Sequence, residues 1–341
     1  MRIHINQAVP GCVLVNDVYA VNETPVVRKQ TALTEHLVDI IKQFLVEYIE
    51  VKPVLVNGDP FSPAEETETA REHRPVFEDV YDTAVEAHEA MWRSWTAGAP
   101  IEMKKARAVV APLLEDIEEN ASHIFTSYQF AELEKYESHH AVSVALLAAL
   151  LAKKHGCSQK EWLGAALAGL LCDASLARVS AAERQKAGKH PIQSYQMAKA
   201  TGLISDEVLL AILQHHERED GSGYPLGMKG GKIYVLSSIV AAADMYHAMA
   251  GERLENEGKS AFHAMRELTM QSFGKLPPAV VETLTEQFIT VMTGKKVQLA
   301  DGSSASIVHL DRREIEYPLV QLEQDGQVVQ LNEKSAIHHV I

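Results

Sequence analysis

Residues 214–225 read Gln-His-His-Glu-Arg-Glu-Asp-Gly-Ser-Gly-Tyr-Pro, and this is the most informative stretch of the chain. Neighbouring residues of a helix point about 100° apart, so His215 and His216 can both turn inward most easily where a helix ends. The next residues include two glycines and a proline, which fix a tight loop and let backbone approach a ligand. We interpret the stretch as metal-binding residues at a helix end, with a plain turn between helices as the alternative.

Two carboxylates lie in apolar surroundings. Asp244 interrupts an alanine-rich helical run, and Asp173 ends the apolar helix expected over residues 162–171. A buried, unpaired carboxylate costs several kcal/mol, and a negative charge at the C-terminal end of a helix also opposes the helix dipole. A nearby cation would resolve both positions. An exposed place on the helix surface is the alternative for Asp244.

Two further histidines are candidate ligands. His140 leads the apolar stripe of a helix that ends near His155, while its neighbour His139 is expected to be exposed. His190 stands just before Pro191 at the start of another predicted helix. Alone, His190 would be an ordinary helix N-terminal residue, so its candidacy depends on the other residues.

In their order along the chain, these residues resemble the HD-GYP family over residues 136–253. That family has a His on the first helix, an adjacent His-Asp on the next, a His before a helix, a His-His-Glu followed by Asp-Gly-x-Gly-Tyr-Pro, and a final Asp. The corresponding positions here are His140, Cys172-Asp173, His190, His215-His216-Glu217 with residues 220–225, and Asp244.

The resemblance implies a mainly α fold, an HD-type helical bundle that holds two divalent transition metals, most commonly iron or manganese. It also implies a bridging hydroxide that attacks a phosphodiester of cyclic di-GMP or a related nucleotide. Carried over, Asp173 would bridge the metals and act in catalysis. One metal would be held by His190, His215 and His216, and the other by His140 and Asp244.

The chain departs from the family at two positions that lie within five residues of one another. The His of the His-Asp pair is Cys172, and the Lys that follows is Leu176. A thiolate binds iron or zinc but is softer and shorter in reach than imidazole, so we expect one metal site to be weakened. Alternatively, Cys172 is a small buried apolar residue. Loss of a cation beside the phosphate is worth roughly 10²–10³ in rate, so a phosphodiesterase of reduced activity and an inactive cyclic di-GMP receptor or signalling adaptor both stay open.

Two residues are expected to contact the nucleotide. Tyr224 in the Gly-Tyr-Pro stretch can stack on a base or form a hydrogen bond, and Arg253 is a partner for phosphate. The family's Glu for a third metal is Tyr136 here, so we expect at most two metals. The family's Tyr-Asp-Ala after the final Asp reads Tyr-His-Ala at residues 246–248.

The composition of the chain limits the classes of molecule that it can bind. The 341 residues carry a formal net charge of −14, which argues against binding of duplex nucleic acid. The longest apolar runs fall short of the roughly 20 residues that a membrane span needs. Three widely spaced cysteines, Cys12, Cys157 and Cys172, fit a reducing cytoplasm better than a disulfide framework. A homodimer stays open.

Composition and periodicity divide the chain into four segments. We expect a small α/β module over residues 1–57, an acidic linker over 58–75, the helical HD-GYP domain over 76–294 and a small β module over 295–341. Start and stop signals support this division: a capping box at 158–161, a Pro-Pro helix start at 277–278, and Asp-Gly hairpin turns at 301–302 and 325–326.

Overall fold

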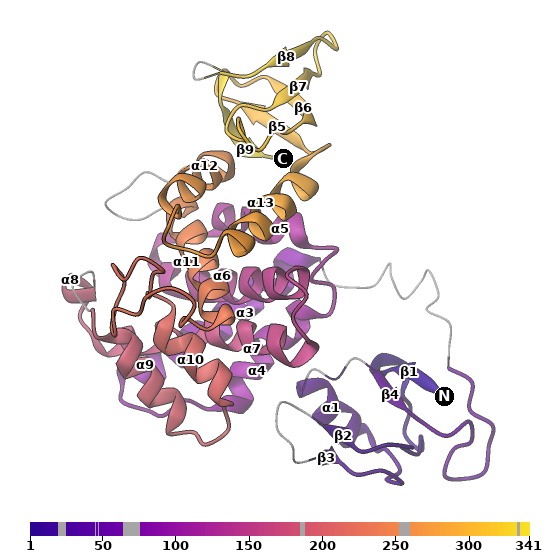
Figure 1. Cartoon of the computed structure of the whole chain (residues 1–341). Coiled ribbons are helices and arrows are strands. Elements are labelled where there is room, and N and C mark those ends of the chain that lie inside the picture. Colours follow the sequence, from indigo (N-terminus) through magenta and orange to yellow (C-terminus); the bar gives the residue numbers. More distant parts are fainter. Residues whose placement is uncertain are drawn as a thin grey trace.

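A computed structural model of the chain describes residues 1–19, 25–44, 46, 48–63, 76–184, 188–251, 260–332 and 335–341 (Figure 1). Most of the described chain is helical, with small sheets near its two ends. The predicted fold class, a helical bundle flanked by a small α/β part and a small β part, is therefore confirmed. Within these ranges, every helix is too short or too polar to cross a lipid bilayer.

The N-terminal part packs around an apolar core of its own. Its elements are β1 (Arg2–His4), η1 (Ile5–Gln7), β2 (Val18–Tyr19), β3 (Pro25–Val27), α1 (Glu35–Gln43) and β4 (Tyr48–Glu50). The antiparallel pairs are β1 with β4 and β2 with β3. Helix α1 begins after Thr34, whose Oγ1 accepts a hydrogen bond from the backbone N–H of Leu37 (3.2 Å). The core residues include Ile3, Leu14 and Ile41.

The helical part follows from residue 77. Its elements are α3 (Phe77–Thr96), α4 (Met103–Leu114), α5 (Ala121–Thr126), η2 (Ser127–Phe130), η3 (Leu133–Lys135), α6 (Tyr136–Lys154), α7 (Gln159–Leu171), η4 (Ala174–Arg178), α8 (Ala181–Arg184), α9 (His190–Lys199), α10 (Asp206–Gln214), α11 (Val235–Ala250), α12 (Ala261–Gln271) and α13 (Pro278–Met292). Helices α6, α7 and α11 lie at its centre, and α3, α4, α9 and α10 surround them (Figure 1).

Helices α6 and α7 pack with their backbones in close approach. A Cβ on Gly169 of α7 would lie only 2.9 Å from the backbone N and Cα of Ala145 on α6. Nearly all side chains of both helices are buried, so the pair is apolar on every side. The short connection between them makes the pair antiparallel, so residues at the start of α6 lie near residues at the end of α7. This arrangement positions His140 and Asp173 for a shared site.

The predicted helix boundaries agree with the structure. Ser158 forms the capping box with Glu161, since its backbone N–H donates to Oε2 of Glu161 (2.8 Å). Gly156, after the end of α6, has φ +87°, a conformation that favours glycine. Pro278 is the first residue of α13.

The chain ends in a five-stranded antiparallel sheet. Its strands are β5 (Lys296–Leu299), β6 (Ser304–His309), β7 (Leu319–Leu322), β8 (Val328–Gln330) and β9 (Ile337–Val340), in the spatial order β8-β7-β6-β5-β9. The two Asp-Gly turns join β5 to β6 and β7 to β8, as predicted. Strand β9 was not predicted, because its short Ile-His-His-Val run carries no turn signal of its own.

The sheet shares an apolar core with the helices. Val297, Ile307 and Val320 belong to the same buried cluster as the helical residues, whereas the N-terminal part has a separate cluster. The division into four segments stays a proposal, and most of the predicted linker, residues 64–75, lies outside the described residues.

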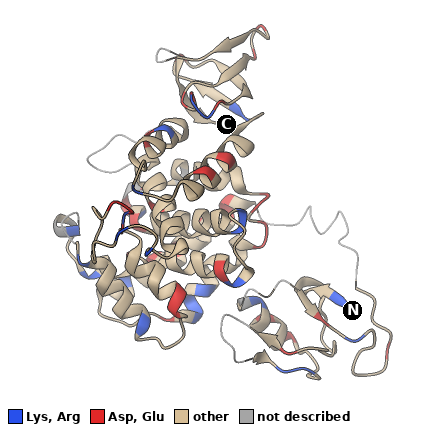
Figure 2. Ribbon diagram, in the orientation of Figure 1, with Lys and Arg blue, Asp and Glu red and all other residues tan. Residues whose placement is uncertain are grey.

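Basic and acidic residues are interspersed along the described ribbon in the view of Figure 2.

Candidate metal centre

Two groups of candidate metal ligands meet inside the helical part and share one carboxylate. The first group is Asp173, His190, His215 and His216, and the second is His140, Asp173 and Asp244. Within each group the ligand atoms lie within 4.8 Å of one another. The residues come from five places in the chain: α6, the end of α7, the start of α9, the end of α10, and α11. The fold therefore collects six of the residues predicted from sequence at one place.

The first group is built around His215. Its Nε2 lies 3.3 Å from Nε2 of His190, and His190 Nε2 lies 3.1 Å from Oδ1 of Asp173. The Nδ1 of His215 lies 2.7 Å from the carbonyl oxygen of Ile212. A carbonyl oxygen only accepts, so Nδ1 carries the proton and Nε2 keeps its lone pair for a metal ion.

The adjacent histidines stand at a helix end, as the sequence predicts. Helix α10 ends at Gln214, whose Oε1 accepts from the backbone N–H of Tyr234 (3.0 Å) and from Oγ–H of Ser237 (3.1 Å). These bonds fix the last turn of α10 against the start of α11. Both His215 and His216 can therefore face the same cluster, with their ring centroids 4.0 Å apart.

The second group joins α6 to α11. The Nε2 of His140 lies 3.0 Å from Oδ1 of Asp244 and 3.8 Å from Oδ2 of Asp173. His140 Nε2 and Asp173 Oδ1 are buried, yet neither atom makes a hydrogen bond within the described residues. Leaving such atoms unsatisfied costs about 1–3 kcal/mol each. Buried imidazole and carboxylate atoms that converge in this way fit a bound cation.

The protonation states also suit a metal site. Burial alone would raise the pKa of Asp173, but the neighbouring His190 holds it well below its usual range. The pKa of Asp244 is low for the same reason, because His140 outweighs the effect of burial. Burial lowers the pKa values of His215 and His216. Ionised carboxylates and neutral imidazoles are the forms that bind metals.

Glu217 of the signature supports the loop rather than the metal. Its side chain is buried; Oε1 accepts from the backbone N–H of Leu226 (2.6 Å) and Oε2 from that of Met228 (2.8 Å). Gly223 lies so close to the end of α10 that a Cβ there would be 2.4 Å from the carbonyl oxygen of His216. The loop after α10 is thus folded back against the histidines.

Tyr224 is the part of this loop that reaches both the site and solvent. Its ring stacks on His216 with 4.6 Å between centroids, and 37% of the residue is exposed. A tyrosine hydroxyl is protonated at neutral pH and can donate a hydrogen bond, and burial raises the pKa of this phenol further. The other expected nucleotide contact, Arg253, lies outside the described residues.

Cys172 is the predicted ligand that the structure does not bring into either group. Its Sγ donates to the carbonyl oxygen of Gly169 (3.3 Å), one turn back on α7, and burial raises the pKa of the thiol. A protonated thiol engaged with its own helix is a poor metal ligand. This geometry agrees with the alternative prediction, a small buried apolar residue.

His139 corrects an expectation from the sequence. It was expected to be exposed, but it is 2% exposed, and its Nδ1 lies 3.3 Å from the hydroxyl oxygen of Tyr81 on α3. Helix α6 is covered on this face by α3, so two adjacent histidines are both buried. Single-helix periodicity cannot reveal a second helix packed on the polar side.

Two residues near the site were missed by reasoning from sequence. His247 was noted only as a departure from the family, and its Nδ1 lies 3.0 Å from Nδ1 of His140. Arg218 donates to the carbonyl oxygens of His215 (3.0 Å) and Glu217 (2.8 Å), and its charge interacts with Asp244 and Tyr224. A cation inside the signature of an acidic chain was the signal that could have found Arg218.

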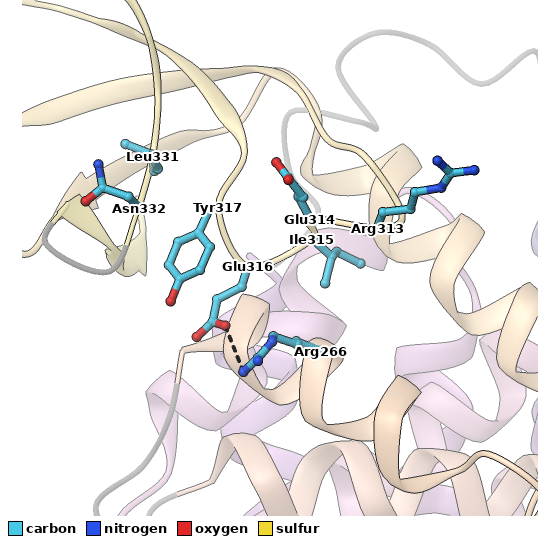
Figure 3. A pocket seen from close by; sticks show the side chains of 8 residues that line it. All are labelled: Arg266, Arg313, Glu314, Ile315, Glu316, Tyr317, Leu331 and Asn332. Atoms are coloured by element: carbon cyan, nitrogen blue, oxygen red, sulfur yellow. Dashed lines mark ion pairs between the residues drawn. The ribbon is translucent and has the colours of Figure 1, made fainter.

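A cavity of about 350 Å³ lies elsewhere, between α12 and the C-terminal sheet (Figure 3). Arg266 of α12 pairs there with Glu316, with 3.2 Å between Nη1 and Oε2. None of the candidate ligands lines this cavity. It is therefore separate from the cluster of histidines and carboxylates.

Comparisons with known proteins agree with the signature. Residues 126–275 match the family model described as HD domain. A cyclic di-GMP phosphodiesterase of Borreliella burgdorferi, PdeB, is 28% identical over 45% of this chain and 40% of its own length. One of Pseudomonas aeruginosa is 25% identical over 68% of this chain and 59% of its own length.

A third relative, 3'3'-cGAMP-specific phosphodiesterase 3 of Vibrio cholerae, is 28% identical over 35% of this chain and 28% of its own length. The chain thus spans about half of the length of the first two relatives and less of the third. The family match covers all six clustered residues and the Gly-Tyr-Pro loop. Residues 126–275 are thus similar to the HD domain family, which agrees with the resemblance to the HD-GYP family that the sequence signature predicts.

Proposed function

We propose that this chain is a metal-dependent phosphohydrolase that cleaves a phosphodiester of a cyclic dinucleotide, with cyclic di-GMP as the first candidate substrate. The observation that carries the proposal is the pair of ligand groups that share Asp173 and consist of converging imidazoles and carboxylates. When bound, divalent ions supply an activated water and stabilise negative charge on phosphate.

The chain's own residues have distinct roles in this proposal. Asp173 contributes to both groups and is the candidate bridge and catalytic residue. His190, His215 and His216 hold one ion, and His140 and Asp244 hold the other. Nitrogen and oxygen donors of this kind can bind iron or manganese, the metals that the resemblance to the HD-GYP family implies. Cys172 adds no donor in its present orientation.

The substrate class rests on the relatives and on the loop after α10. The first two relatives carry the name cyclic di-GMP phosphodiesterase. Tyr224 offers a half-exposed ring beside the cluster, a suitable platform for a nucleobase. Arg253 and Arg218 are the candidate partners for phosphate, because an acidic chain must attract an anion through local cations.

A second candidate function is a receptor or signalling adaptor that binds the nucleotide without hydrolysing it. Two observations favour it: Leu176 stands where the family has a Lys, and the Cys172 thiol points away from the ligands. A third candidate is hydrolysis of another cyclic dinucleotide, since one relative is named for 3'3'-cGAMP. A cytoplasmic location and a homodimer stay predictions.

The test is a turnover assay with cyclic di-GMP and, separately, 3'3'-cGAMP, under anaerobic conditions with Mn²⁺ or Fe²⁺. Metal-dependent product from one substrate, absent in a His215→Ala, His216→Ala variant, supports the enzyme. Saturable binding of nucleotide without product would favour the receptor. Binding should fall more in Arg253→Ala than in Arg71→Ala, which removes a cation from the linker; an equal loss points to nonspecific charge.

A further inference from the structure

His140 has an unusual partner for a candidate metal ligand. Its Nδ1 lies 3.0 Å from Nδ1 of His247, which is 3% exposed and stands one turn after Asp244 on α11. The ring of Tyr136 also stacks on His140, with 5.8 Å between centroids and 20° between planes. His140 is therefore held in place, and the partner of its Nδ1 is another imidazole.

The identity of that partner decides the tautomer of His140. For Nε2 to offer a lone pair to a metal ion, Nδ1 must carry the proton and donate it. His247 must then accept with its own Nδ1. A neutral imidazole can instead donate from Nδ1, and His140 would then carry its proton on Nε2, the atom that faces Asp244. Unlike a carbonyl or carboxylate oxygen, an imidazole at this place does not by itself fix the tautomer of His140.

His215 of the first ligand group shows no such ambiguity. His215 faces the carbonyl oxygen of Ile212, which can only accept, so its tautomer is fixed with Nε2 free. That group also has four candidate donors, whereas the second has three and shares one of them. The two groups therefore differ in the number of donors and in how firmly the donors are oriented.

We propose that His247 is the positioning residue for His140 and that it leaves the His140–Asp173–Asp244 group with the weaker metal affinity. The proposal rests on the metal site of the proposed function and extends it to unequal sites. Outer partners of a ligating histidine typically change metal affinity 10–100-fold, so we expect the two sites to differ by at least about tenfold.

The experiment titrates the metal-free full chain with Mn²⁺ and measures the binding by calorimetry. Elemental analysis of the dialysed protein then gives the number of ions that stay bound. Wild type should bind one ion tightly and a second at least about tenfold more weakly. In His247→Asp a carboxylate can only accept from Nδ1 of His140, so the second ion should bind about tenfold more tightly while the first is unchanged. His247→Ala should not tighten it.

His155→Asp is the matched control, because His155 lies at the C-terminal end of the same α6 and contacts Thr283 instead of the cluster. It should leave both affinities at the wild-type values. Two ions of equal affinity in wild type, or no tightening in a folded His247→Asp, would overturn this inference and leave the proposed function standing. Binding of no ion by wild type would overturn both.

A measurement on wild type covers the case in which His247→Asp does not fold. Long-range ¹⁵N–¹H spectra of the metal-free protein report which ring nitrogen carries the proton. We expect His215 in the single Nδ1–H form and His140 in a mixture of both tautomers. A pure Nδ1–H form of His140 would overturn the role assigned to His247.

Discussion

Asp173 and His190 face each other at the ends of two different helices, with 3.1 Å between Oδ1 and Nε2. Ser175 ties these ends together, because its Oγ–H donates to the carbonyl oxygen of His190 (3.1 Å). The backbone N–H of Ser175 donates to Oγ of Ser194 on α9 (3.1 Å). Hydrogen bonds around Asp173 and His190 thus hold the carboxylate and the imidazole close together. A preorganised pair of metal ligands requires such support.

Removing the paired histidines should remove the bound metal. We expect the double variant His215→Ala, His216→Ala to lose the ion of the first group, because it deletes two of the four donors there. Elemental analysis of purified protein measures this. The adjacent histidines of β9 provide the control, since His338→Ala, His339→Ala removes an equal number of imidazoles far along the chain. Equal metal in the two variants would show that the assigned ligands are not the ligands.

Truncating Glu217 should destabilise the protein. Glu217→Ala leaves the backbone N–H groups of Leu226 and Met228 without their acceptor. Hydrogen bonds to a charged group contribute about 1.5–3 kcal/mol each, so we expect the free energy of unfolding in urea to fall by at least about 2 kcal/mol. Asp220→Ala, in an exposed turn of the same loop, should cost less than about 1 kcal/mol. A loss at Glu217 no larger than that at Asp220 contradicts the anchoring role.

Gly223 should tolerate no side chain. A Cβ there would lie 2.4 Å from the backbone N of Arg218 and from the carbonyl oxygen of His216, so the loop must shift away from the histidines. We expect Gly223→Ala to cost about 1–3 kcal/mol of unfolding free energy and to weaken metal retention. Gly188→Ala is the matched control, because a Cβ at Gly188 meets no atom within 4 Å. Comparable stability of the two variants would refute the close packing of this loop.

Restoring the two replaced positions should raise activity. Cys172→His adds an imidazole beside the second group, and Leu176→Lys adds a cation on the half-buried turn after Asp173. The double variant should hydrolyse cyclic di-GMP at least about tenfold faster than wild type at matched metal content, since one ligand change is often worth 10–100-fold. Cys172 is fully buried, so a melting curve must accompany the assay. A folded variant with two metals and no gain favours the receptor.

Local signals predicted much of the fold. The capping box at Ser158 and the proline at residue 278 mark helix starts that the structure reproduces, because these signals act through backbone geometry within one turn. The candidate ligands could also be found from the sequence, because they follow one another in the order of the HD-GYP signature. The approach of His140 to Asp173 follows from the close packing of α6 and α7 around Gly169.

Long-range packing explains what the sequence did not reveal. The burial of His139 depends on Tyr81, which is 58 residues away on α3. The contact of His140 with His247 spans 107 residues and joins two helices whose mutual rotation no local pattern sets. The Sγ of Cys172 turns toward Gly169 because the thiol is short and its own helix offers the nearest acceptor.

The central claim is that the cluster sharing Asp173 performs metal-dependent hydrolysis of a cyclic dinucleotide. The most direct measurement is product formation from cyclic di-GMP by the reconstituted wild-type chain, compared under the same anaerobic conditions with Asp173→Asn. We expect metal-dependent linear dinucleotide from wild type and a loss of at least about a hundredfold in Asp173→Asn, because that variant removes the shared charge from both groups. Equal product from the two proteins, or none from a wild-type chain shown to bind metal, would contradict the account.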